Sequence, residues 1–110
     1  MVPAAPLLRN NKIARDVVLL KKVLQLFSEI PAIGALKREN IESVDYNSET
    51  GLTLRLIDSK AVVHLGEQNI QTKALQVLRV TDYLESQKQK ARVIDASFTK
   101  KVLVRLRKRS

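Results

Sequence analysis

The sequence predicts an α+β domain, in which two helices cover one face of a mainly antiparallel sheet in the order α-β-β-β-α-β-β. Apolar residues recur at three- and four-residue steps in two separate stretches, which is typical of amphipathic helices. Elsewhere they alternate with polar residues, as strands with one buried face require. The 110 residues are enough for one domain with a single core. Both helices must bury their apolar stripes, so we expect them on the same face of the sheet.

The first helix is predicted over residues 12–29, where the apolar side chains form one wide stripe. It should end before Pro31, because the residue that precedes a proline is biased away from helical angles. Residues 1–11 contain two of the three prolines and show no periodicity, which favours a linker. The domain is therefore expected to span residues 12–106.

Three strands are predicted next, over residues 41–46, 52–56 and 61–65. The polar stretches 47–51 and 58–60 separate them and have the composition of tight turns. Short turns join antiparallel neighbours, so these strands should form a meander.

A second helix should begin at Ile70, with Asn69 as the residue that caps it. Its apolar side chains, from Ile70 to Leu84, lie close to one face. The rest of the chain is predicted as a loop over 87–92, a fourth strand that opens with Val93 and Ile94, a turn over 99–101, a last strand over 102–106 and a basic tail over 107–110.

The formal net charge is +9, from 20 basic and 11 acidic residues. This balance favours an anionic partner: nucleic acid, an anionic membrane surface or an acidic protein. The basic residues gather in two places, on the first helix and at the C-terminal end: Lys12, Arg15, Lys21 and Lys22, and then Lys88, Lys90, Arg92, Lys100, Lys101, Arg105, Arg107, Lys108 and Arg109. The absence of cysteine excludes disulfides and thiolate metal ligands.

The residues that carry chemistry in enzymes form no motif in this chain. His64 is the one histidine, and it has no second histidine or cysteine for a metal site, so we expect an ordinary side chain on the sheet. The serines lack a G-x-S-x-G motif, and Gly34, Gly51 and Gly66 are too far apart for a phosphate-binding loop. We therefore expect no enzymatic activity, metal or cofactor.

A small basic nucleic-acid-binding protein is one interpretation of the charge. Arg107, Lys108 and Arg109 could neutralise phosphates, with an affinity that falls as salt rises. The chain has only four aromatic residues and neither an aromatic RNP-like pair nor a GXXG loop. Non-specific attraction to nucleic acid is the most that this pattern predicts.

Two long stretches carry a more specific pattern, GLTLRLIDSKAVVHLGEQNIQTKALQVLRVTDYL and ARVIDASFTKKVLVRL. A G-x-x-L-x-L strand is followed by a strand that ends in Leu65-Gly66, by a helix with spaced leucines, and by an Ile94-Asp95 strand that leads into a last hairpin. In order and spacing this resembles the extracytoplasmic β domain of the bacterial cell-division family FtsQ/DivIB. The helix over 12–29, preceded by VPAAPLL, resembles the helix that opens the same domain.

The resemblance implies a non-enzymatic scaffold of the divisome at the septum, which binds FtsB-like and FtsL-like division proteins. It implies a longer, single-pass protein of the bacterial inner membrane, whose transmembrane anchor and POTRA domain precede these residues. The β domain itself would lie on the extracytoplasmic side of that membrane. In the family, the partner adds a strand to the open edge of the β domain at its last strand.

Carried over by position, the resemblance assigns the partner-binding site to the last hairpin. Val102–Leu106 would be the edge strand, Phe98 an apolar anchor, and the basic side chains would select an acidic partner. The site residues are Ser97, Phe98, Lys100, Lys101, Val102, Val104, Arg105 and Leu106. The sequence departs from the family at Phe98, where many members have Tyr, at Ser97, often Arg, and at Leu106, often aromatic. Phe98 as ordinary core and the lysines as protection of an edge strand are the alternatives.

Overall fold

The computed structural model describes residues 13–98 and 100–107, and only the backbone of 13–17. The predicted linker 1–11, Lys12, Thr99 and residues 108–110 of the basic tail lie outside this part of the chain, as does the side chain of Arg15.

The first helix, α1 (Ile13–Ser28), ends before Pro31 as predicted. Among its described side chains, those of Val23 and Leu26 are buried, and Ile30 is buried just after the helix. Two short 3₁₀ turns then lead to the sheet, η2 (Gly34–Leu36) and η3 (Arg38–Asn40). Leu36 in η2 is fully buried, so this connector belongs to the core layer rather than to the surface.

The predicted meander is confirmed in β1 (Ile41–Asn47), β2 (Gly51–Leu56) and β3 (Val62–Gly66), which pair antiparallel in sequence order. Alternate residues of β2 are buried: Leu52, Leu54 and Leu56 point into the core, and Thr53 and Arg55 point away from it. The alternation of apolar and polar residues in the sequence therefore matches the two faces of the sheet.

The second helix, α2 (Ile70–Ser86), starts directly after Asn69 as predicted, but Asn69 makes no side-chain cap. The prediction of a capping side chain is wrong because the backbone of Asn69 is left-handed, with φ 55° and ψ 43°. An N-cap that accepts a hydrogen bond from the helix usually has extended backbone angles instead.

After α2 the chain forms β4 (Ala91–Asp95), which runs parallel to β3, and β5 (Leu103–Leu106), which runs antiparallel to β4. The predicted loop over 87–92 was thus too long, because Ala91 is buried and pairs with Leu106. Within the described residues, five strands lie in the order β1-β2-β3-β4-β5, and α2 connects the parallel neighbours β3 and β4. The predicted α+β class with a mainly antiparallel sheet is confirmed.

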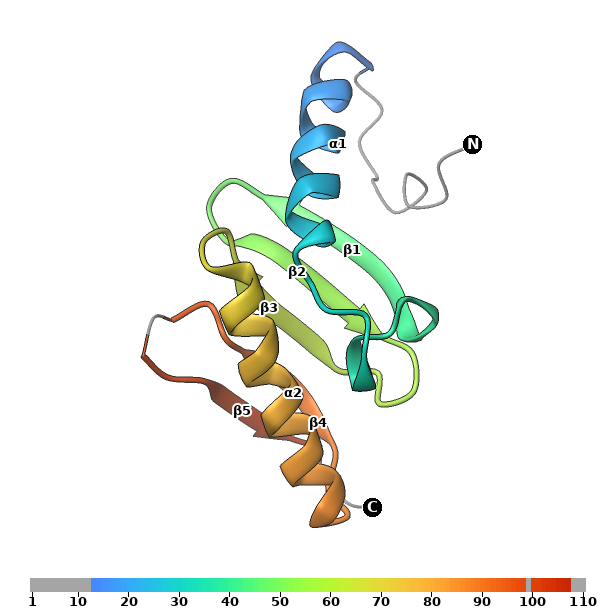
Figure 1. The fold of residues 1–110 in the computed structure, drawn as a ribbon, viewed down its shortest axis with the longest axis vertical. Helices are drawn as coiled ribbons and strands as arrows, with labels where there is room; N and C mark the ends of the chain where they lie inside the picture. Colours follow the sequence, from blue (N-terminus) through green and yellow to red (C-terminus); the bar gives the residue numbers. More distant parts are fainter. Residues whose placement is uncertain (1–12, 99, 108–110) are drawn as a thin grey trace.

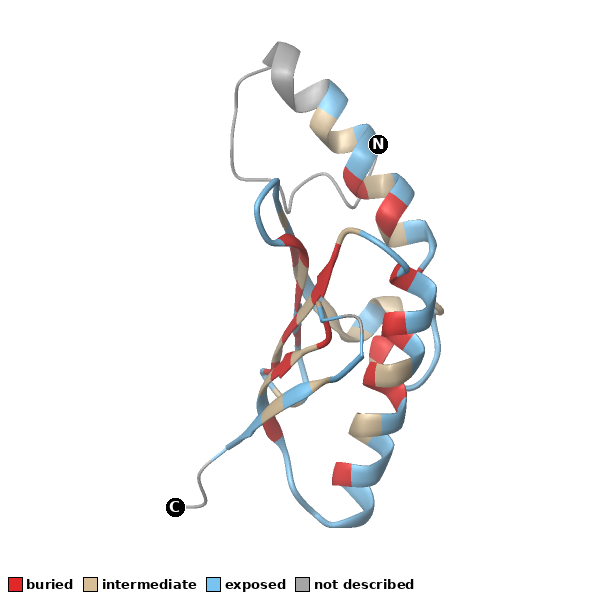
Figure 2. Cartoon of the chain, turned by 90° about the vertical axis from the view of Figure 1, so that its left-hand side faces the viewer, coloured by how far each residue is buried: buried red, intermediate tan, exposed pale blue. Residues whose placement is uncertain are grey.

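The helices cover one face of the sheet only, as predicted (Figures 1 and 2). α1 lies toward β1 and β2, and α2 lies over β3 and β4 (Figure 1). The other face, called the outer face below, carries two rows of paired residues that cross all five strands. One row is Asp45, Thr53, His64, Asp95 and Leu103, and the next is Ser43, Arg55, Val62, Val93 and Arg105.

A surface ion pair joins α1 to the loop before α2. The Lys22 ammonium pairs with the Glu67 carboxylate and lies 5.9 Å from the centre of the Tyr46 ring on β1. The hydrogen bond from Lys22, with a second one from Tyr46, lowers the pKa of Glu67 below its ordinary value of 4.5. The same bond to Glu67 raises the pKa of Lys22.

The lowered pKa of Glu67 predicts a loss of stability in acid. Stability from this group is present above pH 4.5, its ordinary pKa, and is lost as the pH falls through the lower pKa of the folded state. We therefore expect the melting temperature of the wild type to fall more between about pH 6 and about pH 3, on either side of that ordinary pKa, than the melting temperature of Glu67→Gln. Glu42→Gln removes an exposed carboxylate from β1 and serves as the control. Equal losses in the wild type and Glu67→Gln would contradict the prediction.

Candidate functional site

The last hairpin places β5 at one edge of the sheet, which is the position that the sequence predicted for it. Within the described residues β5 pairs with β4 alone. The Arg107 N–H donates to Lys90 O at 2.8 Å, so the backbone groups of Arg107 face β4. Because these groups point alternately to the two sides of a strand, those of Leu103 and Arg105 also face β4. The N–H and C=O groups of Val104 and Leu106 point away from the sheet, and these are the groups that another strand could bind.

The side chains of β5 alternate between the two faces of the sheet. Val104 pairs with the buried Ile94 and packs against the core on the helix side. Leu103 and Arg105 belong to the outer face, and Leu103 and Leu106 are 48% and 47% exposed. The edge strand thus exposes two apolar side chains, Leu103 and Leu106, and carries the Arg105 guanidinium on the outer face.

The segment between β4 and β5 is held by a set of polar contacts. The Asp95 carboxylate accepts from the Ser97 N–H at 3.1 Å and from the Ser97 hydroxyl at 2.6 Å. The Ala96 N–H donates to His64 O at 2.8 Å, and the Lys73 ammonium donates to Ser97 O at 3.1 Å. Lys73 is only 7% exposed. Ser97 is therefore a residue that anchors the segment, with its hydroxyl and carbonyl already engaged.

Phe98 lies outside the core cluster and is 38% exposed, so it is not ordinary core. The Lys101 ammonium lies 4.9 Å from the centre of its ring, a cation–π contact that leaves part of the ring open. Lys100 is exposed, whereas Val102 packs against the core and precedes the strand instead of opening it. The predicted site residues thus lie along one edge, with Phe98 and Lys101 in contact and Val102 turned inward.

Three residues of this edge were not among the predicted site residues. Lys73 supports the segment before β5, Leu103 offers an exposed apolar side chain, and Arg92 lies on β4 beside Arg105. Lys73 could have been noticed, since it falls at helical spacing on the apolar face of α2, between Ile70 and Val77. The neighbourhood of Arg92 and Arg105 depends on strand pairing and has no local signal.

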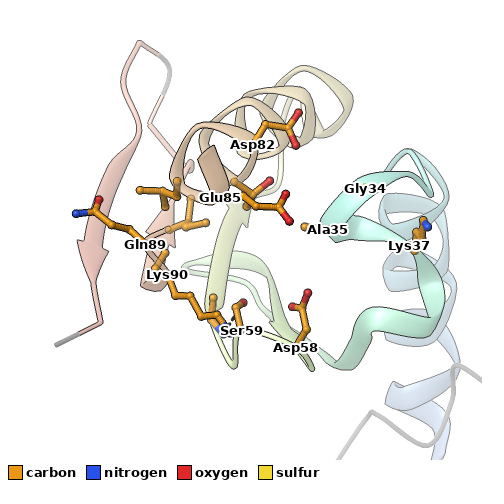
Figure 3. A pocket seen from close by; sticks show the side chains of 14 residues that line it. Gly34, Ala35, Lys37, Asp58, Ser59, Asp82, Glu85, Gln89 and Lys90 are labelled. Atoms are coloured by element: carbon orange, nitrogen blue, oxygen red, sulfur yellow. Dashed lines mark hydrogen bonds between the residues drawn. The ribbon is translucent and has the colours of Figure 1, made fainter. Parts of the chain in front are cut away.

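Two hollows are lined by described residues outside β5. One of about 620 Å³ adjoins the segment before β5, between Phe98, Lys73 and the β1–β2 turn. The other, of about 360 Å³, lies between α2, the connector at Ala35 and the β2–β3 turn (Figure 3). Asp82 and Glu85 line it from α2, and Asp58 lines it from the turn, where Asn40 Nδ2 donates to the Asp58 carboxylate at 3.1 Å. No set of three histidine, aspartate or glutamate side chains in the described part of the chain could hold a metal ion.

The fold and the edge together define a class: a two-layer α+β domain with an open edge strand at its C-terminal end. No family model matches the chain, and no curated protein matches it. Among the described helices, none is both long enough and apolar enough to cross a bilayer.

Proposed function

We propose that this chain is a divisome scaffold domain of the FtsQ/DivIB kind, which binds a partner division protein by strand addition at β5. The observation that carries the proposal is the free side of β5, where the backbone groups of Val104 and Leu106 point away from the sheet. An extended segment laid along this side would continue the sheet and satisfy those groups. Backbone pairing does not depend on residue type, so the departures at Ser97, Phe98 and Leu106 do not weaken it.

The resemblance of the sequence supports the same proposal. Its motifs require three strands, a helix and a closing hairpin in this order, and the observed elements follow that order. FtsB-like and FtsL-like proteins are the proposed partners, and the proposed place is the extracytoplasmic side of the inner membrane, as part of a longer anchored protein. The proposed role is recruitment without catalysis.

The first test is the affinity of the purified chain for the extended segment of an FtsB-like partner, measured by calorimetry. Val104→Pro removes an N–H that faces outward and leaves the bonds between β4 and β5 in place, so it should weaken binding by about tenfold or more while the domain stays folded. Phe98→Ala should weaken binding by a smaller factor, since Phe98 is only 38% exposed.

The control is a thermal melt of each variant, which should remain close to that of the wild type. Unchanged affinity in both variants would remove strand addition at β5. The competing interpretation, a small basic nucleic-acid-binding protein, is tested on the same material by a gel shift. Retention that falls steeply with salt and is lost when Arg107, Lys108 and Arg109 are neutralised would replace the divisome proposal.

A further inference from the structure

The edge of the sheet at β5 has a depression that is lined mainly by arginines. Its volume is about 700 Å³, and it is formed by Arg92, Arg105, Leu106 and Arg107. None of these residues is in the hollow next to Phe98 or in the one below α2. It is therefore a separate surface feature, and it adjoins the free side of the edge strand.

The three guanidiniums are brought together by strand pairing. Arg105 pairs with Val93 on the outer face, and Arg92 lies in the irregular step between the Ala91–Leu106 and Val93–Arg105 pairs. Arg107 is fixed at both ends: its N–H donates to Lys90 O at 2.8 Å and its Nη2 donates to Ser59 O at 2.6 Å. The position of Arg107 is thus tied to the β2–β3 turn as well as to β4.

Among the described residues, no carboxylate forms an ion pair with any of these three arginines. The ion pair found within residues 13–98 and 100–107 joins Lys22 to Glu67, far along the sequence from these arginines. Three like charges around one depression repel each other, and an anion among them would relieve that repulsion. A guanidinium presents two parallel N–H groups, which match the two oxygens of a carboxylate.

We propose that this depression is the specificity subsite of the β5 edge and that it takes an acidic side chain of the docked strand. The proposal rests on the proposed function and adds the chemistry of the partner. Val104 and Leu106 carry the outward-facing backbone groups, so a residue placed opposite Arg105 in an antiparallel strand forms a non-hydrogen-bonded pair. In such pairs the Cα atoms lie about 4.5 Å apart and the side chains come closest.

The two faces of β5 then specify the partner strand. Its residue opposite Arg105 lies on the outer face and reaches the arginines, which favours aspartate or glutamate. The residues on either side of it turn to the helix face, next to Val104 and Leu106, which favours apolar side chains. The partner segment should therefore read apolar, acidic, apolar at this position.

The probes are three synthetic peptides that read the same in both directions: Thr-Val-Thr-Val-X-Val-Thr-Val-Thr, with Glu, Gln or Lys at X. Binding is followed by the ¹⁵N chemical shifts of the purified chain, with Val104 and Leu106 as the reporting amides. We expect the Glu peptide to bind about fivefold more tightly than the Gln peptide, as exposed ion pairs allow, and the Lys peptide to bind most weakly.

Charge reversal tests the position of the contact. Arg105→Glu should reverse the order, so that the Lys peptide binds best. Arg55→Glu is the matched control, because Arg55 is exposed in the same row of the outer face, on β2, and its reversal changes the net charge equally. It should leave the order of the three peptides unchanged.

Four results would overturn the proposal. Equal affinity for the three peptides would refute the acidic subsite and leave strand addition standing, whereas no binding of any peptide would refute strand addition as well. The third result is that phosphatidylglycerol vesicles or an oligothymidylate bind the wild type and Arg55→Glu but do not bind Arg105→Glu. If the chain also shows no preference among the peptides, the depression is a phosphate site. If the chain dimerises through β5, as seen by sedimentation, its occupant is a second copy.

Discussion

Gly51→Ala is expected to destabilise the domain by about 3–5 kcal/mol, a large share of what a domain of this size has to lose. Gly51 opens β2 with φ +78°, a region that side chains other than glycine seldom enter. A Cβ there would lie 2.6 Å from Gly66 Cα and even closer to the Gly66 carbonyl. Backbone cannot move aside as a flexible side chain can, so β2 and β3 would have to separate at this end.

The measurement is the free energy of unfolding from urea denaturation at neutral pH. Thr50→Ala, at the exposed position just before Gly51, is the control and should change the free energy by no more than about 0.5 kcal/mol. A loss below about 1 kcal/mol for Gly51→Ala would contradict the clash with Gly66. Gly66 ends β3 and lies beside Ser97, so the same variant should also disturb the segment that leads to β5.

Arg38→Ala is expected to lower the free energy of unfolding by about 2–3 kcal/mol, because the Arg38 side chain binds the backbone at the C-terminal end of α1. Its guanidinium donates to Ile30 O at 2.7 Å and to Phe27 O at 3.2 Å, and its Cζ lies 4.2 Å from the centre of the Phe27 ring. Carbonyls in the last turn of a helix have no partner within the helix. Partial burial lowers the pKa of Arg38, which nevertheless stays charged at any ordinary pH.

Arg38→Lys is the matched variant for this prediction. A lysine keeps the charge and the aliphatic stem, but it lacks the planar fork that reaches both carbonyls and stacks on the ring. Its loss in the free energy of unfolding should be roughly half that of Arg38→Ala. If Arg38→Lys lowered the free energy of unfolding as much as Arg38→Ala does, the aliphatic stem and the charge would make no contribution to stability. If Arg38→Lys left the free energy of unfolding unchanged, the planar fork would make no contribution.

The edge strand shows where sequence reasoning and structure divide within one element. The alternation of Val102, Val104 and Leu106 with Leu103 and Arg105 predicted a strand, and the structure has it at Leu103–Leu106. Val102 lies just before the strand, and its side chain packs against the core as that of Val104 does. Periodicity cannot distinguish these cases, since both put an apolar residue at the same spacing.

The site divides in the same way. The basic character of the last strand and the half-exposed Phe98 involve residues that could be singled out from the sequence. Lys73 beneath Ser97, and Arg92 beside Arg105, were not predicted to belong to the site. The first contact depends on the packing of α2 and the second on the pairing of β4 with β5, so neither contact has a local signal in the sequence.

The sequence by itself determined the α+β class, the order of the elements and the approximate bounds of most of them. These features depend on the spacing of apolar residues within a single helix or a single strand, which is local information. The tertiary structure alone decided that β4 runs parallel to β3, that Val104 and Leu106 turn their backbone groups outward, and that three arginines meet around one depression. Those outcomes depend on pairing between distant segments, where the core and its hydrogen bonds select one register among several that the sequence pattern permits.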